Sequence, residues 1–263
     1  MTISGNIKGI IGESGTSDEV EIGGAKWSLF REHSEFQIRC AVGDGTNVLW
    51  DCTATGRLTA WHFGDAKKSI VGPLGFSVGI KVMKLHVVDL STPPNKSITS
   101  LEDAACLQVE DKELWVSKKV LSFHSPFFKT MFSSDFKENA TGYCSPKEVN
   151  IVEFKMFLSV LYNLNIPITA QKSLEGLLRL AHKWQCDLVL RFCHDILRSS
   201  DSTFLSLEVK IKLCDRHGFW PLLSAIVDKA EVDEVKQIVQ GGCDPEFRYF
   251  TVSVIMNRLA GSS

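Results

Sequence analysis

The chain has 263 residues, of which 44% are hydrophobic and 10% aromatic, enough apolar surface for one large or two modest packed domains. This composition excludes wholesale disorder. The formal net charge of −2 offers no long-range attraction for a phosphate backbone and argues against a dedicated nucleic-acid-binding module.

Cysteine usage and the N-terminus indicate where the protein works. Eight cysteines occur without a C-x-x-C pair, mostly inside apolar runs, as is typical of small buried side chains in a reducing compartment. The N-terminus lacks a charged segment followed by a long apolar stretch, and no run approaches the roughly 18 apolar residues that cross a bilayer. We therefore expect an intracellular protein, cytoplasmic or nuclear, that binds neither membrane nor nucleic acid.

Residues 1 to about 91 carry the pattern of an all-β domain. Short alternating runs are separated by Gly, Asp and Asn, with tight-turn chemistry at residues 43–45 and 55–56. The expected strands cover residues 20–22, 25–30, 36–42, 48–53, 58–63 and 80–88. Strands of this length with frequent turns predict a small antiparallel β-sandwich or a barrel.

Residues 91–96, with the sequence STPPNK, mark a domain boundary. The two consecutive prolines remove two backbone donors and favour an extended linker. We expect a β-sandwich at residues 1–92, a mixed α/β domain at residues 98–200, and a helical extension with a tail at residues 201–263. The chain as a whole is thus predicted to be α+β with two domains and an extension.

A β-hairpin that runs into two short helices forms the strongest pattern of the chain. Residues 105–109 and 113–116 are apolar strands joined by a polar turn. A helix-like run follows and is interrupted by Ser125-Pro126, where the serine can cap a second helix and the proline can occupy its first position. The second helix carries an apolar stripe at helical spacing, formed by Phe127, Phe128, Met131 and Phe132.

The rest of the chain predicts one short strand and several helices. Residues 148–151 are expected to be the strand and residues 153–162 a buried helix. Thr169 and Asp187 are expected to cap the next two helices, whose apolar faces carry Leu174, Leu177, Leu178 and Ala181, and Leu188, Phe192 and Ile196. Further helices are expected in residues 203–240, with Pro221 near a helix start, while the last 20 residues are ambiguous.

This order of elements resembles the BTB/POZ domain, in which an acidic residue, a hydrophobic hairpin and a segment of the form HKxVL…SPxFxxMF follow one another. Here Asp103 precedes the hairpin, and residues 119–132 read KVLSFHSPFFKTMF. The later family pattern is matched by FLSVLY at residues 157–162 and by LLRLAHKWQ at residues 177–185, so the resemblance covers about 100 residues. The chain departs from the family at Ser117, where the family has His, and in the turn after Tyr162.

The N-terminal part resembles MATH domains, which are β-sandwiches that grip peptide segments of partner proteins. Residues 23–29 read GGAKWSL, similar to the GGxxWxL strand of that family. Cys40 and the WDC of residues 50–52 are similar to MATH-like halves that precede many nematode BTB domains. A generic β-sandwich is the alternative for this region. The C-terminal helices resemble a short three-box or BACK-like extension.

The BTB resemblance implies a dimeric adaptor that recruits a target protein to a cullin-RING ubiquitin ligase. By their places in the family pattern, Phe136, Glu138 and Tyr162 are the expected cullin contacts. The expected homodimer interface comprises Val120, Leu121, Phe123, His124 and Phe127. An unknown target protein is expected to bind residues 1–92. The alternative is a BTB scaffold that assembles oligomers, for example in transcriptional or cytoskeletal assembly, without ubiquitin transfer.

Sequence patterns for catalysis and metal binding are weak. The sequence contains no G-x-S-x-G elbow, no G-x-x-x-x-G-K-[ST] loop, no H-E-x-x-H and no G-x-G-x-x-G motif. His182 and Cys186 are four residues apart and could supply two zinc ligands, but the apolar residues around Trp184 favour a core helix. We expect a protein that is not an enzyme and holds no metal or cofactor. An enzyme within the β domain is the third hypothesis.

Overall fold

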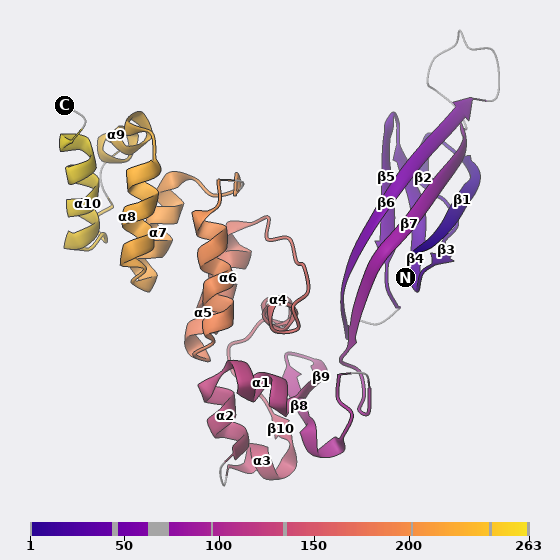
Figure 1. Ribbon diagram of the computed structural model, residues 1–263, viewed down its shortest axis with the longest axis horizontal. Helices are drawn as coiled ribbons and strands as arrows, with labels where there is room; N and C mark the ends of the chain where they lie inside the picture. Colours follow the sequence, from indigo (N-terminus) through magenta and orange to yellow (C-terminus); the bar gives the residue numbers. More distant parts are fainter. Residues whose placement is uncertain are drawn as a thin grey trace. The chain divides into compact units, whose positions relative to one another are not determined.

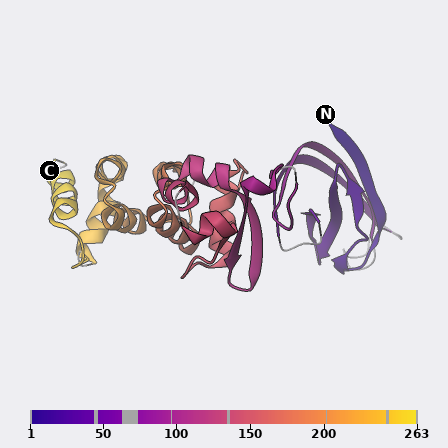
Figure 2. The same ribbon diagram turned by 90° about the horizontal axis from the view of Figure 1, so that it is seen from below.

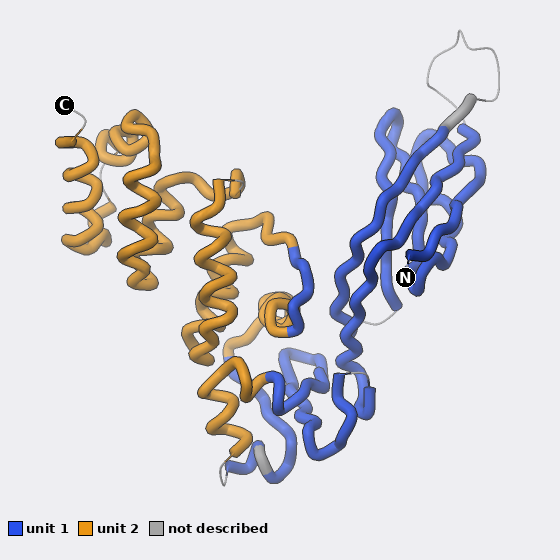
Figure 3. The backbone as a smooth tube through the Cα atoms, viewed as in Figure 1, with its two compact units in different colours: residues 1–120, 135–147, 162–166 blue, residues 121–134, 148–161, 167–263 orange. Residues whose placement is uncertain are grey.

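The computed structural model describes residues 2–43, 47–62, 74–95, 97–133, 136–200, 202–241 and 244–261. They form two compact units, which Figure 3 colours separately. Unit 1 comprises residues 1–120, 135–147 and 162–166, and unit 2 comprises residues 121–134, 148–161 and 167–263. Most of the turn expected at residues 43–45, and Cys243, lie outside the described residues.

The N-terminal part of unit 1 consists of two antiparallel sheets (Figure 1). One sheet has the strand order β1-β7-β6, and in the other β4 pairs with β2, β3 and β5. The strands are β1 (Ile3–Ile11), β2 (Ser14–Thr16), β3 (Val20–Ile22), β4 (Ala25–Glu32), β5 (Glu35–Ala41), β6 (Val48–His62) and β7 (Leu74–Asp89). The antiparallel β domain predicted from the alternating runs is confirmed.

A single apolar core is shared by the two sheets, which Figure 2 shows from below. Leu29 of one sheet and Phe76 and Val78 of the other are fully buried in it. Trp27 packs into the same core, and its indole Nε1 donates to the backbone carbonyl of Ile22 at 3.0 Å. Because this bond satisfies the only polar hydrogen of the ring, the tryptophan can be buried without leaving a hydrogen-bond donor unsatisfied.

One long strand replaces two expected ones. The expected strand at residues 48–53 and residues 58–62 of the next one fall in β6, while residue 63 lies outside the described residues. β6 pairs with β7 along its length, with a register shift between Thr53 and Ala54. The prediction of a turn at residues 55–56 is therefore wrong. A Cβ atom on Gly56 would lie 2.6 Å from Cδ1 of Ile38, so the glycine allows a close contact between the sheets.

The segment after β7 is a hydrogen-bonded turn, whereas the two prolines had predicted an extended linker. Asn95 holds the turn together, because its Nδ2 donates to the backbone carbonyls of Asp89 at 3.0 Å and Thr92 at 3.1 Å. Its Oδ1 accepts from the amide of Ile98 at 2.9 Å. Asparagine favours such turns since its side chain imitates backbone donors and acceptors.

The predicted hairpin is confirmed in unit 1 as β8 (Ala104–Val109) and β9 (Lys112–Ser117). The short strand β10 (Tyr143–Cys144) pairs with β8 in parallel, and the helix α3 (Lys137–Thr141) precedes it. Five of the six β8 residues are buried, as expected of a central strand that is covered on both faces. The 3₁₀ turn η1 (Leu101–Asp103) leads into β8.

Unit 2 contains an aromatic core centred on Trp184. The ring centroid of Trp184 lies 5.2 Å from that of Phe128, 5.5 Å from Phe154 and 4.9 Å from Phe157. Ser125 caps the second helix of the pattern as predicted, since its Oγ accepts from the amide of Phe128 at 3.2 Å. The helices of this region are α1 (Lys118–His124), α2 (Pro126–Ser133), α4 (Ile151–Leu161), α5 (Gln171–Lys183) and α6 (Asp187–Arg198).

Three predictions about helix starts are wrong. The strand expected at residues 148–151 is a turn that leads into α4, because the Asn150 Oδ1 accepts from two first-turn amides at 2.9 and 3.4 Å. Thr169 does not cap α5, whose N-cap is Ala170. Asp187 lies in the first turn of α6 instead of capping it, where its negative charge favours the positive end of the helix dipole.

Four further helices follow α6 among the described residues: α7 (Leu207–His217), α8 (Trp220–Lys229), α9 (Val232–Gln240) and α10 (Tyr249–Ala260). Helix α8 contacts α6, α7 and α10, and α9 contacts α7 and α10. Ser206 caps α7 by accepting from the amide of Val209 at 3.3 Å, and Pro221 lies at the start of α8 as predicted. The helical C-terminal stretch is thus confirmed, and α10 gives a structure to the ambiguous tail.

Candidate functional site

Phe136 lies at the start of α3 with its aromatic ring exposed. The side chain is 52% exposed, although the residue is large and apolar. Its backbone has the extended conformation of a helix N-cap, and its carbonyl accepts from the amide of Ala140 at 3.4 Å. The backbone of Phe136 is therefore held by the helix, while the ring is free to contact another molecule.

The helix that carries Phe136 is attached to the central strand β8. Gly142 ends α3 with φ = 66°, and its amide donates to the carbonyl of Glu138 at 3.0 Å. A side chain would strain this left-handed backbone, and its Cβ would lie 3.3 Å from the carbonyl oxygen of Ala104. The carbonyl of Gly142 accepts from the amide of Cys106 at 2.7 Å. The segment around Phe136 is consequently anchored to β8 by backbone contacts.

Glu138 lies in the first turn of α3, two residues after Phe136, with its side chain partly exposed. Burial raises the pKa of the Cys144 thiol to about 11, and the negative charge of Glu138 adds to this rise. Glu138 thus offers a negative charge on the same short helix whose N-cap is Phe136. A carboxylate beside an exposed aromatic ring can set the register of a bound partner.

Tyr162 directly follows α4 and takes part in a hydrogen-bond network. Its hydroxyl oxygen accepts from the amide of Ser117 at 3.4 Å. The Ser117 hydroxyl donates to Oδ2 of Asp103 at 2.7 Å and accepts from the amide of Val120 at 3.1 Å. The other oxygen of Asp103 accepts from the amide of Lys119 at 2.8 Å. Together, Ser117 and Asp103 satisfy the first free amides of α1.

This environment explains the titration of Tyr162. Burial raises the pKa of its hydroxyl, the hydrogen bond from the Ser117 amide opposes this effect, and the Asp103 carboxylate adds to the rise. The neutral phenol is thus the favoured form. Tyr162 is partly exposed as a residue, while its hydroxyl is engaged within the domain.

The sequence interpretation did not identify Ser117 and Asp103 as a joint cap of α1. It noted Ser117 only as a departure from the BTB pattern. A serine at the end of a strand and directly before a helix-like run is a recognised N-cap signal, so the role of Ser117 could have been predicted. The partnership with Asp103 could not, because it joins the end of β9 to the turn η1 that precedes β8.

The residues expected at the dimer interface differ in exposure. Phe123 is 84% exposed and Phe127 is 42% exposed, whereas Val120 and His124 are partly buried. Leu121 is fully buried within the chain, so its side chain supports α1 from inside. The ring of His124 contacts that of Phe123 edge-on at 4.9 Å. Burial, and then the charge of Arg191, lowers the pKa of His124.

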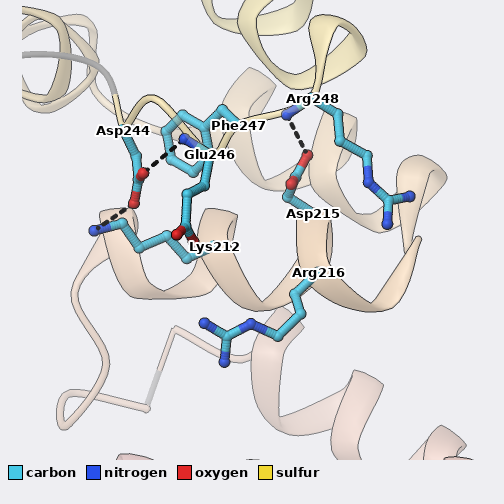
Figure 4. Close-up of a pocket in the computed structure, with 7 residues that line it drawn as sticks. All are labelled: Lys212, Asp215, Arg216, Asp244, Glu246, Phe247 and Arg248. Carbon is cyan, nitrogen blue, oxygen red and sulfur yellow. Dashed lines mark hydrogen bonds and ion pairs between the residues drawn. The ribbon is translucent and has the colours of Figure 1, made fainter.

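A polar pocket of about 210 Å³ lies beside the segment that joins α9 to α10 (Figure 4). Lys212 forms an ion pair with Asp244, with Nζ 3.2 Å from the carboxylate. The buried carboxylate of Asp215 accepts from the amide of Arg248 at 3.3 Å and from the hydroxyl of Thr251. These contacts attach the connecting segment to α7. This structural role explains the charges of Lys212, Asp215 and Asp244 without a bound ligand.

The two residues with possible zinc-ligand spacing do not share a helix, because His182 lies in α5 and Cys186 is the N-cap residue of α6. Cys186 is fully buried, and burial raises the pKa of its thiol. His182 stacks on His217 with ring centroids 4.8 Å apart. Within the described ranges, no group of three or more His, Cys, Asp or Glu side chains is arranged to hold a metal ion. None of the helices in the described residues is long and apolar enough to cross a membrane.

Comparison with known proteins identifies the domain that carries these surfaces. The BTB/POZ domain model matches residues 100–201. BTB and MATH domain-containing protein 38 of Caenorhabditis elegans is 28% identical over 171 residues, which are 62% of this chain and 42% of that protein.

Two other relatives show how far the similarity extends. BTB and MATH domain-containing protein 15 of Caenorhabditis elegans is 26% identical over 123 residues, 47% of this chain and 44% of that protein. Kelch-like protein 40a of Danio rerio is 25% identical over 161 residues, 51% of this chain and 26% of that protein. The matched part spans less than half the length of each of these relatives.

The N-terminal antiparallel sheets are consistent with a MATH domain, the second component named in these nematode relatives. The hairpin, the capped α2 and the Trp184 core all lie within the matched range. The chain therefore contains a BTB/POZ domain at residues 100–201 and is a distant relative of nematode proteins that combine BTB and MATH domains.

Proposed function

We propose that the protein is a non-enzymatic adaptor that works as a dimer and recruits a target protein to a cullin-RING ubiquitin ligase. In this proposal, residues 1–92 bind the target, residues 98–200 form the BTB domain, and residues 201–263 form a helical extension. The adaptor acts inside the cell, in the cytoplasm or the nucleus. It requires no metal or cofactor.

The exposure of Phe136 is the observation that carries the cullin proposal. A ring that is 52% exposed on an anchored helix can enter an apolar groove of a partner at little entropic cost, because the backbone is already fixed. Burying an aromatic side chain of this kind is the usual energetic centre of a small interface. Glu138 supplies a nearby charge, and the partly exposed Tyr162 supplies a second aromatic contact.

Dimer formation is supported by the exposed rings of α1 and α2. Phe123 and Phe127 offer a large apolar surface to water, which is unfavourable in an isolated chain. Interfaces between identical subunits are rich in such side chains and commonly twofold symmetric. We propose that Phe123 and Phe127 contact the second subunit directly, with Val120 and His124 at their side and Leu121 supporting α1 from below.

Affinity purification tests the cullin contact. The intact tagged chain is compared with a Phe136→Ala, Glu138→Lys double variant, and cullins are identified by mass spectrometry. We expect the wild type to retain a cullin and the variant to lose it. A matched control, Tyr249→Ala with Glu19→Lys, removes an exposed aromatic ring and reverses an exposed charge elsewhere. Equal cullin recovery by both variants would contradict the proposed contact.

The exposed Phe123 also supports a second candidate function, a BTB scaffold that assembles oligomers without ubiquitin transfer. Dimerisation needs the α1 and α2 surface but does not need Phe136. A wild-type protein that forms dimers, retains other partners and captures no cullin would favour this scaffold. Purification with and without residues 1–94 then shows which part of the chain holds each partner.

A further inference from the structure

Two cysteine thiols from different sheets of the N-terminal β domain lie next to each other. Cys40 belongs to β5 and Cys52 to β6, which lie in different sheets. Their side chains are hydrogen-bonded to each other and both pack against the shared core. In the same two strands, a Cβ atom on Gly56 of β6 would lie 2.6 Å from Cδ1 of Ile38 of β5, so this part of the two sheets is in close contact.

Both cysteines lie on edge strands. Among the described strands, β5 pairs with β4 alone and β6 pairs with β7 alone. Cys40 and Cys52 therefore link the edges of the two sheets at one rim of the β domain. Edge strands carry unpaired backbone donors and acceptors, and their spacing decides what else can pair with them.

The pair is accessible, unlike the cysteines of the helical core. Cys40 and Cys52 are partly exposed, whereas Cys186 and Cys193, which also lie near each other, are fully buried. Cys144 is partly exposed and has a carboxylate, Glu138, as its charged neighbour. Within the described part of the chain, Cys40 and Cys52 thus combine access with a neighbouring thiol.

We propose that Cys40 and Cys52 form a reversible disulfide that joins strands β5 and β6 when the protein meets a peroxide. The Cys52 thiolate attacks one peroxide oxygen, the O–O bond breaks, and the departing hydroxide takes a proton to become water. Cys40 then attacks the sulfur of the resulting sulfenic acid, loses its proton and releases a second water. Two thiols are oxidised to one disulfide while one peroxide is reduced to two waters.

The order of these steps follows from the hydrogen bond between the thiols. Burial, and then the nearby Cys52, raises the pKa of Cys40 to about 12. Burial also raises the pKa of Cys52, but the hydrogen bond from Cys40 opposes that rise. Because the hydrogen bond opposes the rise only for Cys52, we assign the attack on the peroxide to Cys52 and the resolving step to Cys40. A dithiol reductant reverses the reaction by exchange.

The disulfide would close a loop of 13 residues, from Cys40 to Cys52. Closing a loop of this length in the unfolded chain stabilises the β domain enough to raise its Tm by roughly 10 °C. The rim formed by β5 and β6 would be fixed in the oxidised protein and freer to separate in the reduced protein. This inference is independent of the proposed cullin role.

Oxidation of the intact chain tests the proposal. Reduced protein is treated with hydrogen peroxide, remaining thiols are alkylated, and the digest is analysed by mass spectrometry. We expect a cross-linked peptide that joins Cys40 to Cys52, together with the rise in Tm. Both should disappear after treatment with dithiothreitol. Cys144→Ser should behave as the wild type, while Cys40→Ser and Cys52→Ser should form no such cross-link.

Three results would overturn the proposal. Cys40 and Cys52 could both remain alkylated after peroxide treatment, the cross-links could join other cysteines, or the cross-linked protein could show no change in Tm. The first two results come from the wild type alone, so they do not depend on the folding of any variant. The oxidised protein must also keep the mass of a single chain in a denaturing gel without reductant, because a disulfide between two chains would refute the proposal.

Discussion

Replacing Ser117 by alanine should loosen the start of α1. The Ser117 side chain is buried, with the residue 2% exposed, and its hydroxyl makes two hydrogen bonds, one to the Asp103 carboxylate and one from the Val120 amide. Loss of the N-cap costs about 1 kcal/mol. Loss of a hydrogen bond to a charged group costs about 1.5 to 3 kcal/mol. We take about 1.5 kcal/mol, because the Asp103 carboxylate keeps its hydrogen bond from the Lys119 amide. The free energy of local opening should therefore fall by about 2.5 kcal/mol.

Hydrogen exchange measured by mass spectrometry on peptides covering residues 117–124 provides the assay. A loss of about 2.5 kcal/mol corresponds to exchange that is faster by roughly 60-fold. Ser122→Ala is the matched control because it makes the same change within α1 at a partly buried site. The reasoning is refuted if Ser117→Ala exchanges within about twofold of Ser122→Ala.

Two further predictions concern the dimer and acid stability. Phe123→Asp with Phe127→Asp should convert a dimer to a monomer in light scattering, because both rings are exposed in the single chain. Burial and then His182 lower the pKa of His217 from 6.5 to about 4, so the folded state disfavours its protonation. The unfolded state binds the proton more readily, and stability should fall as pH drops from about 6.5 towards 4. His217→Phe keeps an aromatic ring against His182 and should show a smaller acid loss of Tm.

Each of these predictions has its own counter-result. Tyr249→Asp changes an equally exposed ring on α10 and should leave the dimer intact, so dissociation by both variants would contradict the assignment to α1 and α2. Parallel plots of Tm against pH for wild type and His217→Phe would show that His217 does not contribute to the acid loss.

Local patterns in the sequence were sufficient for the hairpin and for one helix cap, Ser125, whereas the caps predicted at Thr169 and Asp187 are wrong. Ser125 and Ser206 act as caps because a serine before a helix satisfies an amide of the first turn, whatever the rest of the fold does. A rule of the same kind wrongly predicted a turn at residues 55–56. Gly56 is instead a strand residue whose missing side chain leaves room for Ile38 of the opposite sheet. Short-range rules cannot include such a contact.

The candidate sites also combine features that the sequence predicts with features that depend on contacts between distant residues. Phe136 could be placed by its position in the BTB pattern, but its exposure depends on the anchoring of α3 to β8. The engagement of the Tyr162 hydroxyl with Ser117 depends on two residues 45 positions apart. Cys40 and Cys52 looked like two separate hydrophobic residues in the sequence, and only the packing of two sheets makes them a pair.

The central claim is that Phe136 and Glu138 bind a cullin. It is tested most directly by measuring the Kd between the purified intact chain and a purified cullin, for wild type and for Phe136→Ala with Glu138→Lys. We predict that wild type binds and that the double variant binds at least about 30-fold more weakly, as expected for the loss of a hot spot. The Tyr249→Ala, Glu19→Lys control should bind as wild type. A wild-type protein that does not bind, or a double variant with an unchanged Kd, would contradict the account.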